Sequence, residues 1–136
     1  MLFLLAGLDI ETPAAPCVAY ADRLRQAGAN TAVKVYENTH HGWERLGAQP
    51  IDAPREENYA KCRVWVEDDG SMTAADTGEK IPESSWHEWA AKTCMTYGTR
   101  CCGGTPGQKE RGKTDILAFL RRHGFLAGTG PGAAVR

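Results

Sequence analysis

The chain has 136 residues, a formal net charge of −1 and 24% charged residues, an ordinary composition for a single globular domain. A charge so close to zero gives no electrostatic reason to expect a nucleic-acid partner. The longest apolar stretch, at the N-terminus, is far too short to cross a membrane and lacks the basic start of a signal peptide, so we expect neither a membrane nor nucleic acid among the partners.

Residues 1–43 predict a parallel strand–helix–strand unit. Leu2–Ala6 is a continuous apolar run, which is typical of a strand covered on both faces. Thr12, followed by a proline, favours a capped helix start, and apolar residues at helical spacing continue to Gly28, the expected helix stop. Ala32–Tyr36 is rich enough in valine for a second strand. Because such a unit is parallel, both strands end at the same edge of the sheet.

Candidate catalytic residues follow both predicted strands. Asp9 and His41 lie just beyond the strand ends, 32 residues apart, at the edge where open α/β sheets bind ligands. Asp9 is expected to accept the Nδ1–H of His41, to fix its tautomer and to stabilise the imidazolium that forms when the ring takes a proton. Glu11 and Glu37 are expected to be surface charges.

Two further residues near the predicted base are candidates for substrate binding. His40 either shapes the loop or contacts substrate, and the sequence alone does not exclude that it exchanges roles with His41. Trp43 is expected to line a substrate pocket or to serve as an aromatic residue of the core.

The same residues carry a family resemblance. The segments concerned are Leu5-Ala6-Gly7-Leu8-Asp9 with Thr12-Pro13, then Val35-Tyr36-Glu37 with His40-His41-Gly42-Trp43, and finally Thr114–Leu120. They resemble the dienelactone hydrolase family, whose members have a strand ending in Gly-x-Asp, a helix, a strand with a Tyr-containing turn, and His-Gly-aromatic. The resemblance implies an α/β-hydrolase fold, hydrolysis of carboxylic ester or lactone bonds by a Cys or Ser nucleophile, Asp9 as the triad acid and His41 as the triad base.

The resemblance also predicts how the chain is organised. Its fold class is α/β, the C-terminal part of an α/β-hydrolase. The predicted parts are the βαβ unit at 1–43, an insertion at 44–104 that contains cysteines, the final core helix at 105–126 and a disordered Gly/Ala/Pro-rich tail at 127–136. No cofactor is expected.

A nucleophile is missing from the sequence. Neither Gly-x-Ser-x-Gly nor Gly-x-Cys-x-Gly occurs, and the three serines all lie in the middle segment. The run Cys101-Cys102-Gly103-Gly104 is not expected to be a nucleophile turn, because no strand is predicted before it. On its own the chain is therefore expected to be inactive or to give weak, water-mediated hydrolysis. Either Met1 is an internal start or a truncation point, or the sheet is completed by a homodimer through the N-terminal strand.

The middle segment predicts a small decoration near the edge that holds the site. Its expected elements are a strand at Tyr59–Glu67, a turn at Asp68–Gly70, a return strand at Ser71–Ala74, a second turn at Asp76–Glu79 and a serine-capped helix at Ser84–Ala91.

Four cysteines in this segment allow three pairings: Cys62, Cys94, Cys101 and Cys102. A bond between the adjacent Cys101 and Cys102 is geometrically awkward, so two bridges are expected to join each of them to Cys62 or Cys94. Bridged cysteines indicate a periplasmic or secreted protein, and reduced, packed cysteines are compatible with the cytoplasm. A zinc site with His87 nearby is the other alternative.

Three functions remain open on the sequence alone. The first is a hydrolase of small-molecule esters or lactones, with His41 as general base and acid. The second is a non-catalytic dimeric fragment that binds a ligand or partner. The third is a metal-binding module built on the cysteine cluster.

Overall fold

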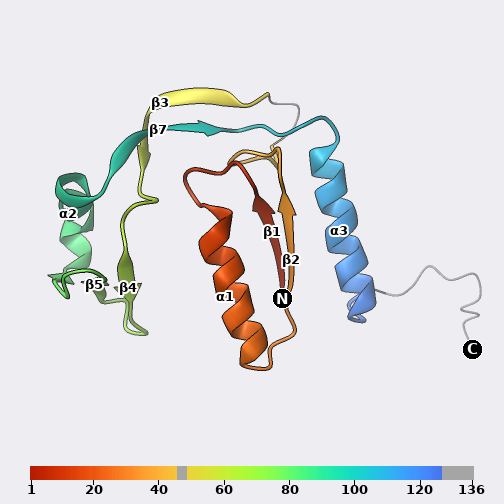
Figure 1. Cartoon of the computed structure of the whole chain (residues 1–136), viewed down its shortest axis with the longest axis horizontal. Helices are drawn as coiled ribbons and strands as arrows, with labels where there is room; N and C mark the ends of the chain where they lie inside the picture. Colours follow the sequence, from red (N-terminus) through yellow and green to blue (C-terminus); the bar gives the residue numbers. More distant parts are fainter. Residues whose placement is uncertain (46–48, 127–136) are drawn as a thin grey trace, which may run out of the picture.

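A computed structural model describes residues 1–45 and 49–126 and shows a mixed α/β structure (Figure 1). The predicted tail at 127–136 lies outside the described residues. In chain order the elements are β1 (Leu2–Ala6), α1 (Ala14–Gln26), β2 (Ala32–Tyr36), β3 (Ile51–Asn58), β4 (Val64–Val66), β5 (Met72–Ala74), β6 (Lys80–Ile81), η1 (Glu83–Ser85), α2 (Trp86–Thr93), β7 (Thr96–Cys101) and α3 (Gln108–Arg122). None of the helices in this described part is long and apolar enough to span a membrane.

The predicted parallel strand–helix–strand unit is confirmed. β1 and β2 pair in parallel with Leu2 opposite Ala32 and Ala6 opposite Tyr36. Helix α1 begins directly after a proline and gives way to a turn in which Gly28 has φ +86°, a left-handed conformation that a glycine adopts at no steric cost. Both strands therefore end at one edge, as the site requires.

The strand pair lies between two helices, with α1 on one face and α3 on the other (Figure 1). Phe3 points to the α1 face, where its ring meets Tyr20 at 6.2 Å in an edge-on contact. Lys34 and Tyr36 point to the opposite face, where both side chains bond to Asp115 of α3. Because the described strands give β1 a partner along one edge only, its first four residues remain half-exposed and only Ala6 is buried.

The predicted final helix is present as α3 and is fastened to the strand pair at two levels. The Tyr36 hydroxyl donates to Asp115 at 2.6 Å, and the Lys34 ammonium donates to the same carboxylate at 2.7 Å. Nearer the start of α3, the Trp43 ring packs edge-on against Tyr36 and lies over Gly112, where a Cβ atom would come within 2.6 Å of the indole. Glycine in mid-helix here makes room for the tryptophan.

The middle segment differs from its prediction in where its strands run. The predicted strand at Tyr59–Glu67 is confirmed only over β4, Val64–Val66, and is wrong over residues 59–63. There β3 ends at Asn58, whose side-chain oxygen accepts the Ala60 N–H and turns the chain. The long antiparallel ribbon of β3 and β7 was not predicted, because its residues are mostly polar and carry no clear alternation. Figure 1 shows this ribbon running across the ends of β1 and β2.

Other expectations for the segment are confirmed. The return strand is β5, and the two predicted turns connect β4 to β5 and β5 to β6. The predicted helix is present as η1 and α2, but its serine cap is wrong. The Ser85 hydroxyl donates to the Pro82 carbonyl rather than accepting an N–H of the helix.

The predicted disulfide pairing is wrong. The bridges are Cys62–Cys94, with Cα atoms 5.0 Å apart, and Cys101–Cys102, with Cα atoms 3.7 Å apart. Strand β7 carries Cys101 along its length away from Cys94, and Cys102 adopts a φ of 71°, which brings the neighbouring sulfurs together. Within residues 1–45 and 49–126 no group of His, Cys, Asp or Glu is arranged to hold a metal ion, so the zinc alternative has no ligand set there.

Candidate active site

Asp9 and His41 meet at the edge where β1 and β2 end, as the sequence predicted. His41 Nδ1 lies 3.0 Å from Asp9 Oδ2. Backbone bonds continue the pairing past β1, because the Gly7 N–H donates to the carbonyl of Tyr36, the last residue of β2, and the Leu8 N–H donates to the carbonyl of Thr39 in the loop that follows, each at 2.9 Å. These two bonds hold the Asp9 and His41 loops side by side.

The Asp9 carboxylate is held by its own loop. Its Oδ1 accepts the N–H groups of Glu11 and Thr12 at 2.9 and 2.8 Å, and its Oδ2 accepts the Thr12 hydroxyl at 2.8 Å. Thr12, which the sequence predicted as a helix cap, thus bonds to the acid instead. The Asp9 side chain is only 7% exposed, and these bonds fix its orientation toward His41.

The charge state of Asp9 follows from these contacts. Burial disfavours the carboxylate and acts to raise its pKa. The hydrogen bonds from the Thr12 N–H, the Thr12 hydroxyl, the Glu11 N–H and His41 favour the carboxylate, and together they hold the pKa of Asp9 below its usual value. The group is therefore an anion at neutral pH, which is what orientation of a histidine base requires.

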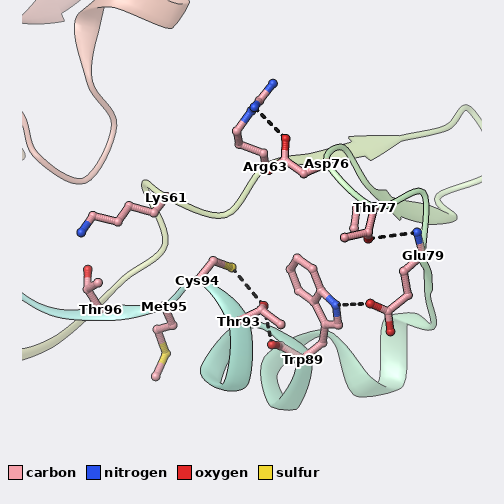
Figure 2. Close-up of a pocket in the computed structure, with 11 residues that line it drawn as sticks. Lys61, Arg63, Asp76, Thr77, Glu79, Trp89, Thr93, Cys94, Met95 and Thr96 are labelled. Atoms are coloured by element: carbon pink, nitrogen blue, oxygen red, sulfur yellow. Dashed lines mark hydrogen bonds and ion pairs between the residues drawn. The ribbon is translucent and has the colours of Figure 1, made fainter.

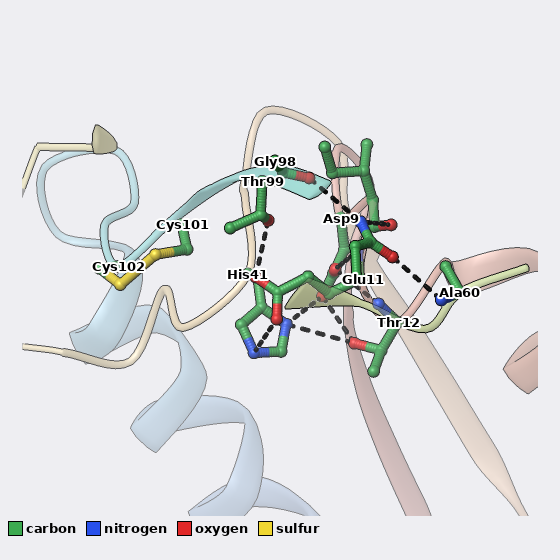
Figure 3. A network of polar contacts seen from close by, with 11 residues as sticks. Asp9, Glu11, Thr12, His41, Ala60, Gly98, Thr99, Cys101 and Cys102 are labelled. Atoms are coloured by element: carbon green, nitrogen blue, oxygen red, sulfur yellow. Dashed lines mark hydrogen bonds and ion pairs between the residues drawn. A yellow bond between two sulfur atoms is a disulfide. The ribbon is translucent and has the colours of Figure 1, made fainter. Parts of the chain in front are cut away.

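A second carboxylate lies on the other side of the imidazole ring. Glu11 Oε2 is 3.6 Å from His41 Nε2, and Glu11 Oε1 accepts the Thr99 hydroxyl at 2.6 Å (Figure 3). The expectation that Glu11 is a plain surface charge is wrong, since its side chain is 21% exposed and faces the candidate base. The position of Glu11, two residues after Asp9, could have indicated from the sequence that it lies near the site. Nothing in the sequence indicated Thr99, because it lies on the unpredicted strand β7.

The other predicted site residues lie close by in different surroundings. His40 is half-buried, and its Nδ1 has no hydrogen-bond partner in the described part of the chain. Trp43 packs against Tyr36 and also lines a cavity of about 210 Å³ that Asp9 and His41 share. The substrate-binding roles of His40 and Trp43 stay predictions.

A larger cavity lies away from this pair. A cavity of about 460 Å³ is formed by the β4–β5 region, α2 and the start of β7. Figure 2 shows the Trp89 side chain in the middle of the lining residues, with its indole nitrogen bonded to Glu79. Arg63 and Asp76 pair with one another above it at 2.7 Å, so the charges of these two groups are already matched.

A second histidine–carboxylate contact shows what distinguishes the first. His87 Nε2 lies 2.9 Å from Glu57, whose pKa is lowered by hydrogen bonds from Tyr59 and His87. The His87 side chain is 65% exposed and the Glu57 side chain 37%, and no backbone N–H group donates to this carboxylate among the bonds of the described residues. Such an exposed ion pair contributes little to the stability of the fold. The Glu57 carboxylate also lacks the backbone hydrogen bonds that fix the orientation of Asp9.

Comparisons with known proteins add no relative, since no family model, no curated protein and no solved structure matches the chain. The candidate site is therefore defined by its own geometry.

Proposed function

We propose that Asp9 and His41 are the acid and base of a hydrolase that acts on carboxylic ester or lactone bonds, within the C-terminal part of an α/β-hydrolase fold. The observation that carries the proposal is the 3.0 Å contact between His41 Nδ1 and a buried carboxylate that three further hydrogen bonds hold in place. In this role Asp9 keeps the Nδ1 proton on the ring, and His41 Nε2 removes a proton from the attacking group and returns it to the leaving alcohol.

The position of the pair on the fold supports the same function. The acid and base follow two parallel strands whose ends share one edge, which is the place where α/β sheets assemble their sites. The chain order of acid before histidine agrees with that of α/β-hydrolases. The cavity beside the pair, lined by Leu4, Leu5 and Trp43 among others, offers an apolar surface for the acyl or ring portion of a small substrate.

The attacking group is a separate part of the proposal. The sequence contains no nucleophile elbow, and Cys101 and Cys102 beside His41 are bonded to each other. Cys17 is a free thiol that lines the same cavity as Asp9 and His41, but it lies within helix α1 and not on a strand-to-helix turn. In this proposal the chain supplies general-base catalysis, and the nucleophile is either water or a Cys or Ser from outside the 136 residues. With water alone the expected rate is low, because general-base catalysis contributes only about 10²- to 10⁴-fold.

The test is hydrolysis of 4-nitrophenyl acetate by the whole chain. His41→Ala should remove the rate above buffer, and Asp9→Asn should lower it about tenfold or more, because the imidazole loses the group that fixes its tautomer.

His87→Ala is the matched control, since it deletes the other histidine that pairs with a carboxylate. Its rate should equal that of the wild type. A rate that is indifferent to His41→Ala, or that falls equally in His87→Ala, contradicts the proposal, because general surface imidazole would then explain the hydrolysis.

A further inference from the structure

The Cys101–Cys102 disulfide lies directly behind the candidate base. Strand β7 ends at Cys101, which forms an isolated parallel bridge with His41. The N–H of Cys102 donates to the His41 carbonyl at 2.7 Å. Gly42 lies next to Cys102 as well, since a Cβ atom on Gly42 would lie 3.4 Å from the Cα of Cys102, in ordinary contact. The backbone of His41 and Gly42 therefore lies against the disulfide.

Cys102 is held in a conformation that residues with a side chain rarely adopt. Its φ of 71° is the one left-handed value at a non-glycine position in the described residues. The bond to the neighbouring sulfur closes a small ring that includes the Cys101–Cys102 peptide, so opening the ring removes the restraint that keeps this φ.

The same strand also reaches the far side of the imidazole. Thr99, two residues before Cys101, donates its hydroxyl to Glu11, and Glu11 faces His41 Nε2. Figure 3 shows Thr99 and Cys101 on one strand, with Glu11 between Thr99 and the imidazole ring. The chain at the end of β7 therefore contacts the His41 carbonyl directly through Cys102, and it contacts the His41 ring through Thr99 and Glu11.

The two cysteines of the bridge differ in exposure. Cys101 as a residue is 8% exposed, whereas Cys102 is half-buried. Because Cys102 is the more exposed residue, its sulfur is the one that we assign to attack by a thiolate, with the sulfur of Cys101 as the leaving group.

We propose that Cys101–Cys102 is a thiol–disulfide exchange site that takes small-molecule dithiols, and that its redox state controls the orientation of His41. The thiolate of the dithiol attacks Cys102 Sγ, the protein S–S bond breaks, and Cys101 Sγ leaves and takes a proton. The second thiol of the reagent then attacks its own sulfur in the mixed disulfide and releases Cys102 as a thiol. Two electrons pass to the protein, and the reagent becomes a cyclic disulfide. If His41 is the base of the proposed hydrolase, its orientation also controls hydrolysis, and this part rests on the proposed function. The exchange reaction and the change in the orientation of His41 do not rest on it.

The first measurement uses dithiothreitol on the folded chain, followed by alkylation and peptide mass spectrometry. Cys101 and Cys102 should gain label at reductant concentrations that leave the helical circular dichroism unchanged. Cys17, which is free in the structure, is the internal reference because it is a thiol in both states. Absence of label at Cys101 and Cys102 until the chain unfolds overturns the exchange site.

The second measurement follows the base itself and needs no enzymatic activity. After reduction, the Cys102 amide should lose its protection from hydrogen exchange, because its bond to the His41 carbonyl is broken. Carbethoxylation of His41 by diethyl pyrocarbonate should change by about fivefold or more, which is the lower end of ordinary coupling between sites. Label at both cysteines with unchanged amide protection and unchanged His41 reactivity overturns the control of His41.

Two variants separate this bridge from the other one. Cys62→Ser with Cys94→Ser should keep the redox response of His41, and Cys101→Ala with Cys102→Ala should lose it. Should neither double variant fold, the same comparison is made on the wild type, by relating His41 reactivity to the label at each cysteine pair. If ester hydrolysis is absent while the His41 response persists, the proposed function fails and the exchange site stands.

Discussion

Substitution of Gly7 by alanine tests the link between the strand ends and the candidate site. Gly7 lies between β1 and Asp9, and a Cβ atom there would come within 2.8 Å of the Cα and carbonyl oxygen of Glu37. Both are backbone atoms of the loop that leads from β2 to His41, so they do not swing aside as a side chain would. The Gly7 N–H also donates to Tyr36 O at 2.9 Å, which ties the two segments together at the point of the clash.

The size of the effect follows from two opposing contributions. To reach ordinary contact of 3.4 Å, the segments must separate by about 0.6 Å, and overpacking of this kind costs about 1–3 kcal/mol. Alanine also restricts the unfolded chain, which returns about 0.4–1 kcal/mol because Gly7 does not have a positive φ. We therefore expect Gly7→Ala to lower the free energy of unfolding by about 1–2 kcal/mol. The same separation stretches the contact between Asp9 and His41 beyond hydrogen-bonding distance.

The assay is urea denaturation of the wild type and Gly7→Ala, followed by circular dichroism, with 4-nitrophenyl acetate hydrolysis measured on the same samples. Leu8→Ala, at a neighbouring position that is 44% exposed, is the control and should stay within about 0.5 kcal/mol. Rates in Gly7→Ala should fall about tenfold, because a small misplacement of catalytic groups is costly. A stability equal to that of the wild type would show that the loops are not in the close contact described here.

Three further changes have expected outcomes. Tyr36→Phe removes the hydroxyl that donates to Asp115 and should cost about 1 kcal/mol in urea denaturation; no loss would mean that water replaces the bond fully. Replacing Cys62 and Cys94 by serine opens a bridge that closes 32 residues and should cost about 3–4 kcal/mol in thermal unfolding, whereas a loss under 1 kcal/mol would contradict the bridge. Because the pKa of Asp9 is lowered on folding, its stabilisation is present above its usual pKa and lost as the pH falls through the lowered value, so Asp9→Asn and the wild type should converge in acid; a constant difference at every pH would refute this.

The sequence determined the first third of the structure. The apolar run at Leu2–Ala6 and the valine-containing segment Ala32–Tyr36, with one helical pattern between them, predict a parallel pair with a helix on one face. Since both strands of such a pair end at the same edge, the sequence predicted that Asp9 and His41 come close. This part was predictable because each element carries its own local signal and the connection has one allowed geometry.

The middle segment was predictable only where turn chemistry is local. The two turns, and β5 between them, follow from Asp and Gly residues close together in the sequence, and they were predicted correctly. The β3–β7 ribbon pairs segments that are far apart in the chain, with Ile51 opposite Cys101. Most residues of both strands are polar, so no alternation of apolar and polar residues indicates either strand. The bond between Cys101 and Cys102 is likewise accompanied by the positive φ of Cys102, which cannot be predicted from the residue types.

The surroundings of the base were decided by tertiary structure alone. The sequence supplied Asp9 and His41, but the placement of Glu11 against His41 Nε2 required Thr99, which β7 brings from 88 residues away. The same strand sets Cys102 against the His41 carbonyl. The physical reason is that the β1–α1–β2 unit is specified by local sequence patterns and by one short connection. The contacts of β7 join segments that are far apart in the chain and carry no such pattern, so they depend on the fold of the whole chain.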